Sequence, residues 1–213
     1  MKLKICGLMR KQDVQLCEEL GVDVLGFVVE YPREVPWNLT RDQAKRLLSA
    51  ARCPTCIVTG GTPESVIALA GELKPDRIQL HYKETVAQTA EIVAELIKSG
   101  IKTIRAVHSE AEIAALCETE IEAILVDSRT SENAAENGLA VDTDLFNRIK
   151  EKSTKPLIIA GGITPENVVD IIAQTGADWI DVMSGVERSP GVKDRIKLMT
   201  LTGNLRVPCK LPG

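Results

Sequence analysis

The chain has few aromatic residues, no excess of positive charge and no long apolar run. Aromatic residues make up 3% of its 213 residues, and 30 acidic side chains outnumber 26 basic ones, for a net charge of −4. Nucleic-acid-binding proteins need basic surfaces and stacking platforms, so we expect no nucleic-acid partner. No segment approaches the length of a membrane span, and residues 1–4 run directly into a predicted strand instead of a signal peptide. These absences predict a cytoplasmic protein without membrane contact.

The six cysteines lack the spacing of a metal site or a disulfide framework. Cys53 and Cys56 form the only Cys-x-x-Cys pair and have no second pair of ligands. They precede a predicted strand, whereas a redox pair of this type begins a helix. We therefore expect free thiols at these positions in preference to a zinc site, and the sequence predicts no metal centre.

Short apolar runs alternate with helical patterns along the whole chain. Each run is continuous, as expected for a parallel strand buried on both faces, and the segments between them place apolar residues three and four positions apart. Eight such units predict an α/β fold, a single-domain (βα)8 TIM barrel of eight parallel strands over residues 1–213. The predicted strands are Leu3–Cys6, Val24–Val29, Thr55–Thr59, Arg77–Leu80, Thr103–Ala106, Ala123–Val126, Leu157–Ala160 and Trp179–Val182.

Two glycine pairs are each followed by a Thr-Pro-Glu sequence, at residues 62–64 and 164–166. In this order the threonine hydroxyl suits an N-cap, proline suits the first helical position, and the carboxylate lies near the positive end of the helix dipole. We therefore expect one helix to begin at Pro63 and another at Pro165.

The last two predicted strands each lead into glycine. Gly161 and Gly162 follow the seventh strand, and Ser184 and Gly185 follow the eighth. Glycine lets the backbone approach a ligand without a Cβ in the way, and backbone N–H groups near helix starts attract anions. Because the loops after strands seven and eight commonly bind phosphate in a βα barrel, these four residues predict a phosphate site.

Two proton-transfer candidates lie at the carboxyl ends of predicted strands. Cys6 ends the first strand and Asp127 follows the sixth, so both are expected at the barrel mouth, where catalytic side chains of this fold project. A thiol and a carboxyl across one pocket can divide proton removal and proton donation, although Cys6 taken alone is more typical of a buried core thiol. Arg105, on the fifth strand, is expected inside the barrel, either paired with a rim carboxylate or in contact with ligand.

Several segments together resemble the phosphoribosylanthranilate isomerase family. They are KICG at 4–7, DVLGFV at 23–28, IQLH at 78–81, AILVDS at 123–128, AGGITPENV at 160–168, SGVE at 184–187 and PGVKD at 190–194. The resemblance covers nearly the whole chain in the family's order. It implies an enzyme of tryptophan biosynthesis that performs an Amadori rearrangement of a small phosphorylated substrate, N-(5-phosphoribosyl)anthranilate, without metal or organic cofactor. A monomer or a homodimer suits this function.

The resemblance also implies roles for single residues. The family's general base corresponds to Cys6 and its general acid to Asp127. The phosphate would lie at the four loop residues described above, with Asp181 facing the ribose or steadying its loop. His81 matches the family's strand-four histidine, with structural and substrate-binding roles equally open. Arg33 is a candidate partner for the substrate carboxylate.

Departures from the family pattern concentrate at the end of the site that would hold the anthranilate. Where the family has an arginine after strand two, this chain has Trp37, and Arg33 lies four positions earlier. Met183 replaces a serine, and the family's glycine-rich loop after Asp127 is replaced by residues 128–142. Three hypotheses remain, in decreasing order of support: a divergent isomerase, a paralogue acting on another phosphorylated sugar or aminosugar, and a noncatalytic phosphate-binding barrel.

Overall fold

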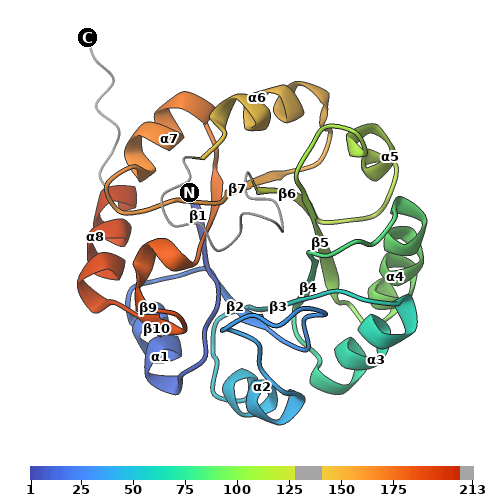
Figure 1. Cartoon of the computed structure of the whole chain (residues 1–213), viewed down its shortest axis with the longest axis horizontal. Coiled ribbons are helices and arrows are strands. Elements are labelled where there is room, and N and C mark those ends of the chain that lie inside the picture. The colour runs from blue at the N-terminus through green and yellow to red at the C-terminus, as the bar shows by residue number, and fades with distance from the viewer. Residues whose placement is uncertain (128–140, 207–213) are drawn as a thin grey trace.

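The computed structural model describes residues 1–127 and 141–206, in which eight parallel strands close into one barrel (Figure 1). Each strand pairs with its neighbours in chain order, and β8 pairs with β1 to complete the barrel, as predicted. Most of the altered loop at 128–142 lies outside the described residues. The strands are β1 Lys2–Ile5, β2 Val24–Val28, β3 Thr55–Thr59, β4 Arg77–Leu80, β5 Lys102–Val107, β6 Ala123–Asp127, β7 Leu157–Ala160 and β8 Trp179–Val182.

Helices follow the strands and form a ring around the barrel (Figure 1). They are α1 Lys11–Glu19, α2 Arg41–Leu48, α3 Pro63–Leu73, α4 Val86–Lys98, α5 Ile113–Cys117, α6 Thr143–Lys152, α7 Val168–Thr175 and α8 Arg195–Arg206. Between β8 and α8 the chain forms the short helix η1 Ser184–Val186 and the two-stranded hairpin β9 Glu187–Ser189 and β10 Val192–Lys193. None of the described helices combines the length and the apolar character that a membrane crossing requires.

The ends of the strands place the two proton-transfer candidates at one rim. β1 ends at Ile5, one residue earlier than predicted, but the backbone N–H of Cys6 still donates to the Val182 carbonyl at 2.9 Å and continues the ladder. β6 extends to Asp127, which pairs in register with Ala160. Because all strands are parallel, Cys6 and Asp127 both lie at the carboxyl ends of strands.

The two predicted helix starts have different outcomes. α3 begins at Pro63 after an N-cap at Thr62, as predicted. The prediction for the second helix is wrong, because α7 begins three residues later than expected, at Val168. Residues 164–167 form a turn before it, in which the Thr164 hydroxyl accepts from the Glu166 N–H at 3.3 Å and the Asn167 side-chain oxygen accepts from the Thr164 N–H at 2.8 Å. The positive end of α7 therefore lies further from the glycine pair than the sequence indicated.

Side chains alternate between the barrel interior and the surrounding helices. The interior cluster is buried and mostly small or branched, and it consists of Val24, Cys56, Ile104, Ala106, Ala123, Leu125, Ile158, Ala160 and Trp179. A separate cluster at the barrel mouth contains Cys6, Val28 and Val58. The remaining apolar core lies between the sheet and the helices. The barrel is therefore packed through its centre, and only its mouth is left for a ligand.

The same alternation corrects the prediction for Arg105. Ile104 and Ala106 face the barrel interior, so Arg105 between them points outward, towards the helices. Its guanidinium donates to the Glu84 carbonyl at 2.5 Å and lies 3.6 Å from the Glu112 carboxylate. Arg105 is therefore a buried brace outside the barrel and contacts neither the interior nor the cavity at the mouth.

The cysteines of the described residues are all free thiols, as predicted for Cys53 and Cys56. Cys56 lies inside the barrel on β3, while Cys53 is half-buried at the opposite end of the strands from the mouth. Over residues 1–127 and 141–206, no group of three or more histidine, cysteine, aspartate or glutamate side chains is arranged to hold a metal ion.

Candidate active site

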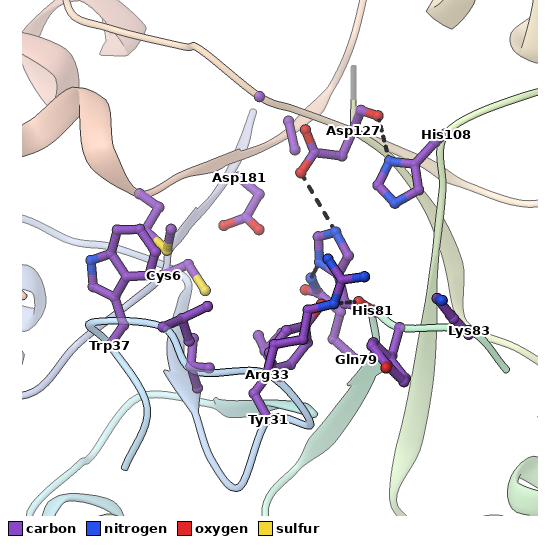
Figure 2. A pocket seen from close by; sticks show the side chains of 17 residues that line it. Cys6, Tyr31, Arg33, Trp37, Gln79, His81, Lys83, His108, Asp127 and Asp181 are labelled. Atoms are coloured by element: carbon purple, nitrogen blue, oxygen red, sulfur yellow. Dashed lines mark hydrogen bonds and ion pairs between the residues drawn. The ribbon is translucent and has the colours of Figure 1, made fainter. Parts of the chain in front are cut away.

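A cavity of about 320 Å³ opens at the carboxyl ends of the strands (Figure 2). Its wall is formed by the ends of β2, β3, β4, β6, β7 and β8 and by the segments that follow β1, β2, β4, β5, β7 and β8, so residues far apart in the sequence meet there. The predicted site residues that line it are Cys6, Arg33, His81, Asp127, Gly161 and Asp181. Gly162, Ser184 and Gly185 belong to the adjoining loops and do not line it.

Cys6 is positioned by two glycines. Gly7 adopts a φ of +70°, which turns the chain away from β1 directly after the thiol. A Cβ on Gly26 would lie 3.0 Å from the Cys6 sulfur, so the neighbouring strand leaves room for the side chain only because it carries glycine here. Cys6 is 5% exposed, and this burial raises the pKa of its thiol. Lys4 and Lys193 oppose that rise by their charge.

Asp127 lies on another side of the cavity from Cys6, and both point into it (Figure 2). Its carboxylate is 3.6 Å from His81 Nε2. The Gln79 amide lies 3.1 Å from His81 Nδ1, so the ring is held between Gln79 on one edge and Asp127 on the other. The Asp127 carbonyl also contacts His108 Nδ1 at 3.0 Å.

Asp181 lies on the cavity wall between Cys6 and Asp127 in Figure 2. Its Oδ2 accepts a hydrogen bond from Lys4 Nζ at 2.7 Å, and Lys4 itself is completely buried. Its Oδ1 is buried and has no hydrogen-bond partner among the described residues. A buried carboxylate oxygen without a partner is costly, so Asp181 is arranged to receive a donor from a ligand in the cavity.

The glycines of the predicted phosphate site bring the loops after β7 and β8 into close contact. Gly161 and Gly162 adopt φ angles of +86° and +73°, which other residues rarely do. The Gly185 backbone packs against the β7 loop so closely that an added Cβ would lie 1.9 Å from the Ile163 carbonyl oxygen. The two loops therefore pack against each other next to the cavity, on whose wall Gly161 lies.

Substitution of Gly185 by alanine is expected to separate these two loops. The contact is with backbone atoms, which cannot move aside as a side chain can, so we expect a loss of about 1–3 kcal/mol in unfolding free energy. Thermal unfolding with and without inorganic phosphate measures this loss and any weakening of phosphate binding. Gly203→Ala is the matched control, because Gly203 lies in α8 with open space around it, and alanine there favours the helix. Equal unfolding temperatures for Gly185→Ala and the unaltered chain would contradict the loop contact.

The loop after β2 places Trp37 and Arg33 on different parts of the cavity wall. Trp37 Nε1 donates to Glu187 Oε2 at 3.2 Å, and its ring packs beside Gly7 in the mouth cluster with Met183. Arg33 lies on the other side, with its guanidinium 5.8 Å from the centre of the Tyr82 ring. Trp37 therefore supplies an apolar wall near the thiol, and the cation of the loop comes from Arg33.

Comparison with known proteins identifies the family to which this arrangement belongs. A model of the N-(5'-phosphoribosyl)anthranilate (PRA) isomerase family matches residues 3–204. The chain belongs to the PRA isomerase family. It is 32% identical over 208 residues to the PRA isomerase of Cereibacter sphaeroides, covering 93% of this chain and 95% of that one. The resemblance inferred from the sequence motifs is confirmed, and the chain is an isomerase.

Solved PRA isomerase structures share the whole barrel. The enzyme from Thermotoga maritima has a TM-score of 0.80 at 27% identity, covering 96% of this chain and 98% of that one. A PRA isomerase in complex with reduced 1-(o-carboxyphenylamino)-1-deoxyribulose 5-phosphate has a TM-score of 0.78 at 26% identity, covering 96% and 97%. The similarity therefore extends over the full domain and is not restricted to the phosphate loops.

Several residues around this PRA isomerase site were not among the sequence predictions. Gln79 could have been found, because it precedes His81 by two positions on one strand and must share its face. Tyr31 and Tyr82 could not, since their ring contact joins two loops. The Tyr31 hydroxyl donates to the His81 carbonyl at 2.6 Å, so these loops fix the histidine from both sides.

Proposed function

We propose that this chain isomerises N-(5-phosphoribosyl)anthranilate to 1-(2-carboxyphenylamino)-1-deoxyribulose 5-phosphate, with Asp127 as general acid and Cys6 as general base. One observation carries the assignment: both side chains point into a single cavity whose wall continues into the two glycine loops. Family membership supports the reaction, and the geometry supports the roles. A phosphate seated at Gly161, Gly162, Ser184 and Gly185 would place the sugar between acid and base.

The acid acts first. Asp127 in its protonated form donates its proton to the furanose ring oxygen, the bond between this oxygen and C1′ breaks, and the nitrogen lone pair forms an iminium at C1′. His81, whose Nε2 lies 3.6 Å from the carboxylate, stabilises Asp127 once the proton has left. His81 is thereby assigned to positioning the acid.

The base then removes the proton from C2′. Cys6 takes this proton as a thiolate, the C–H electron pair forms a double bond to C1′, and the iminium becomes a neutral enolamine, which tautomerises to the aminoketose product. Burial raises the pKa of the Cys6 thiol, which disfavours the thiolate in the empty site. The positively charged iminium favours the thiolate, so the base is activated when the ring has opened.

The carboxylate of the anthranilate is assigned to Arg33. Trp37 occupies the position where the family has its arginine, and its indole N–H is used by Glu187. Arg33 lines the cavity on the side of Tyr82, where its guanidinium can present two parallel donors to a carboxylate. Asp181 Oδ1 is placed to accept from a hydroxyl or amine of the substrate.

Substitution of Arg33 by alanine is expected to raise KM about tenfold or more, because a charge-assisted hydrogen bond contributes about 1.5–3 kcal/mol. Steady-state kinetics measure KM and kcat separately, and kcat should change less. Arg46→Ala is the control, since Arg46 is exposed on α2 and does not line the cavity. An unchanged KM in Arg33→Ala together with a raised KM in Lys83→Ala would move the carboxylate to Lys83, which also lines the cavity.

A coupled assay tests the function itself. The labile substrate is generated in situ, and turnover is followed as loss of anthranilate fluorescence. Turnover supports the isomerase. No turnover, while a different sugar phosphate raises the unfolding temperature, would favour the paralogue hypothesis. No turnover with any phosphorylated sugar, while phosphate still binds, would favour a noncatalytic binding protein.

The proposed function also includes a cellular compartment and an oligomeric state for this chain. Five free thiols in the described residues are typical of a reducing compartment, and we assign the chain to the cytoplasm, which cell fractionation tests. A structural neighbour from Thermotoga maritima at 25% identity is described as dimeric, with monomers generated from it. We propose a monomer or a homodimer for this chain, which analytical ultracentrifugation distinguishes.

A further inference from the structure

Lys4 places a positive charge in the interior of the barrel, beneath the catalytic mouth. Its side chain is fully buried on β1, and its Nζ lies 2.7 Å from Asp181 Oδ2 on the adjacent strand β8. The register of the two strands pairs Lys4 directly with Asp181. Below this pair, the interior is filled by apolar residues such as Val24 and Trp179. A buried lysine ammonium group destabilises the fold in such surroundings unless an opposite charge pairs with it.

The ion pair keeps this lysine protonated. Burial alone would lower the pKa of Lys4, but the Asp181 carboxylate raises it well above the ordinary value by charge and by a hydrogen bond. Only one Asp181 oxygen is used in this contact. The other is buried and has no partner among the described residues, and Asp181 itself is one of the residues that line the cavity. Lys4 therefore fixes the orientation of a carboxylate that presents its second oxygen to the ligand.

The same ammonium group faces Cys6. Residues two positions apart on a strand point to the same side, so Lys4 and Cys6 both face the axis of the barrel, with Lys4 one layer deeper. The positive charge of Lys4 lowers the pKa of the thiol against the effect of burial. The other charged groups that act on this sulfur are Asp181, which raises the pKa, and Lys193, which lowers it.

We propose that Lys4 is a positioning residue of the isomerase, which holds a permanent positive charge beneath Cys6 and directs the second oxygen of Asp181 into the cavity. This inference rests on the proposed role of Cys6 as general base. A neutral side chain at position 4 would leave the thiolate without one of the two cations that act on it and Asp181 without its ion-pair partner.

The pH dependence of Cys6 alkylation tests this directly. Iodoacetamide reacts with the thiolate, and peptide mass spectrometry measures the rate at Cys6 separately from the other cysteines. An opposite charge within about 4–6 Å moves a pKa by about 1–3 units, so loss of Lys4 should slow alkylation at neutral pH about tenfold or more. The rising limb of kcat/KM against pH should move to higher pH in the same variants. A purely structural role for Lys4 would move neither profile.

Three variants separate charge from packing. Lys4→Met removes the charge and the donor, Lys4→Gln removes the charge but keeps an N–H donor for Asp181, and Lys4→Arg keeps the charge. We expect Lys4→Gln and Lys4→Met to shift both profiles and Lys4→Arg to stay near the unaltered chain. Lys4→Gln provides the decisive comparison if Lys4→Met does not fold. Arg77→Met is the matched control, because Arg77 is a buried cation paired with Glu122 at the opposite end of the barrel.

The inference is overturned if folded Lys4→Gln gives the same Cys6 alkylation profile as the unaltered chain, or if Arg77→Met shifts that profile equally. The alkylation measurement requires no turnover, so it tests the effect of Lys4 on the Cys6 thiol even if the proposed reaction is wrong. Full activity in Cys6→Ala would exclude Cys6 as the general base. The effect of Lys4 on the Cys6 thiol would still be measured by alkylation in the variants that keep Cys6.

Discussion

Replacement of Cys6 by alanine is expected to lower kcat about 100- to 10,000-fold, because the variant loses the only thiol on the cavity wall among the described residues and with it the proposed acceptor of the C2′ proton. KM should change much less, since the contacts assigned to phosphate and carboxylate remain. The coupled fluorescence assay measures both constants.

Cys56→Ala is the matched control for this loss. Cys56 is also a fully buried cysteine, but it lies inside the barrel on β3 and does not line the cavity. If loosened packing alone explained the effect at Cys6, Cys56→Ala would lose activity similarly. We expect it to lose some stability and to keep its kcat. Activity at the unaltered level in Cys6→Ala would exclude the thiol as the base.

Replacement of Asp127 by asparagine is the second large effect, with an expected loss in kcat of about 100- to 10,000-fold. The amide keeps the shape of the carboxyl but cannot deliver an acidic proton to the ring oxygen, so ring opening becomes the slow step. Single-turnover kinetics should then show slow consumption of substrate without a build-up of ring-opened intermediate.

The control is Asp76→Asn, at the opposite end of the barrel. Asp76 accepts hydrogen bonds from the backbone and the side chain of Thr55 at 2.7 and 2.9 Å, so its neutral analogue should cost stability. It lies far from the mouth and should retain kcat. A variant Asp127→Asn that turns over as fast as the unaltered chain would show that the acid is another group, and His81 would be examined next.

The barrel and the positions of Cys6 and Asp127, the proposed base and acid, could be predicted because each depends on chain order and local patterns. Continuous apolar runs such as Ile158–Ala160 fix a strand wherever both faces are buried. In a parallel barrel, the residue that ends a strand must lie at the mouth. Cys6 and Asp127 therefore meet at one rim, whatever the details of the loops between them.

Other features depend on contacts that the sequence does not encode locally. Whether Arg105 points into the barrel or towards the helices depends on which alternate residues of β5 face inward. Residues Thr103 to Val107 are all buried, so this strand has no exposed face that would indicate the direction. The Thr-Pro-Glu residues form a turn in which the Asn167 side chain accepts from the Thr164 N–H, and α7 begins after it at Val168. The buried pair of Lys4 and Asp181 joins the first strand to the last.

The structure also shows a spatial relation between two departures from the family pattern, Trp37 and Met183. Trp37 and Met183 are far apart in the chain, but both lie against Gly7, where an added Cβ would come within 3.2 Å of each. The Glu187 carboxylate accepts from Trp37 and is itself 2.9 Å from Lys193. The loop after β2 and the loop after β8 therefore form one packed wall beside Cys6, and both departures from the family pattern lie in it.

The most direct test of the acid and base pair is the activity of the double variant beside the two single variants in the fluorescence assay. Groups that act in one proton-transfer sequence do not contribute additively. We therefore expect Cys6→Ala with Asp127→Asn to be about as slow as the slower single variant, and the unaltered chain to convert substrate fully. Losses that multiply in the double variant, or a double variant as active as the unaltered chain, would contradict the proposal that these two residues serve one reaction in one cavity.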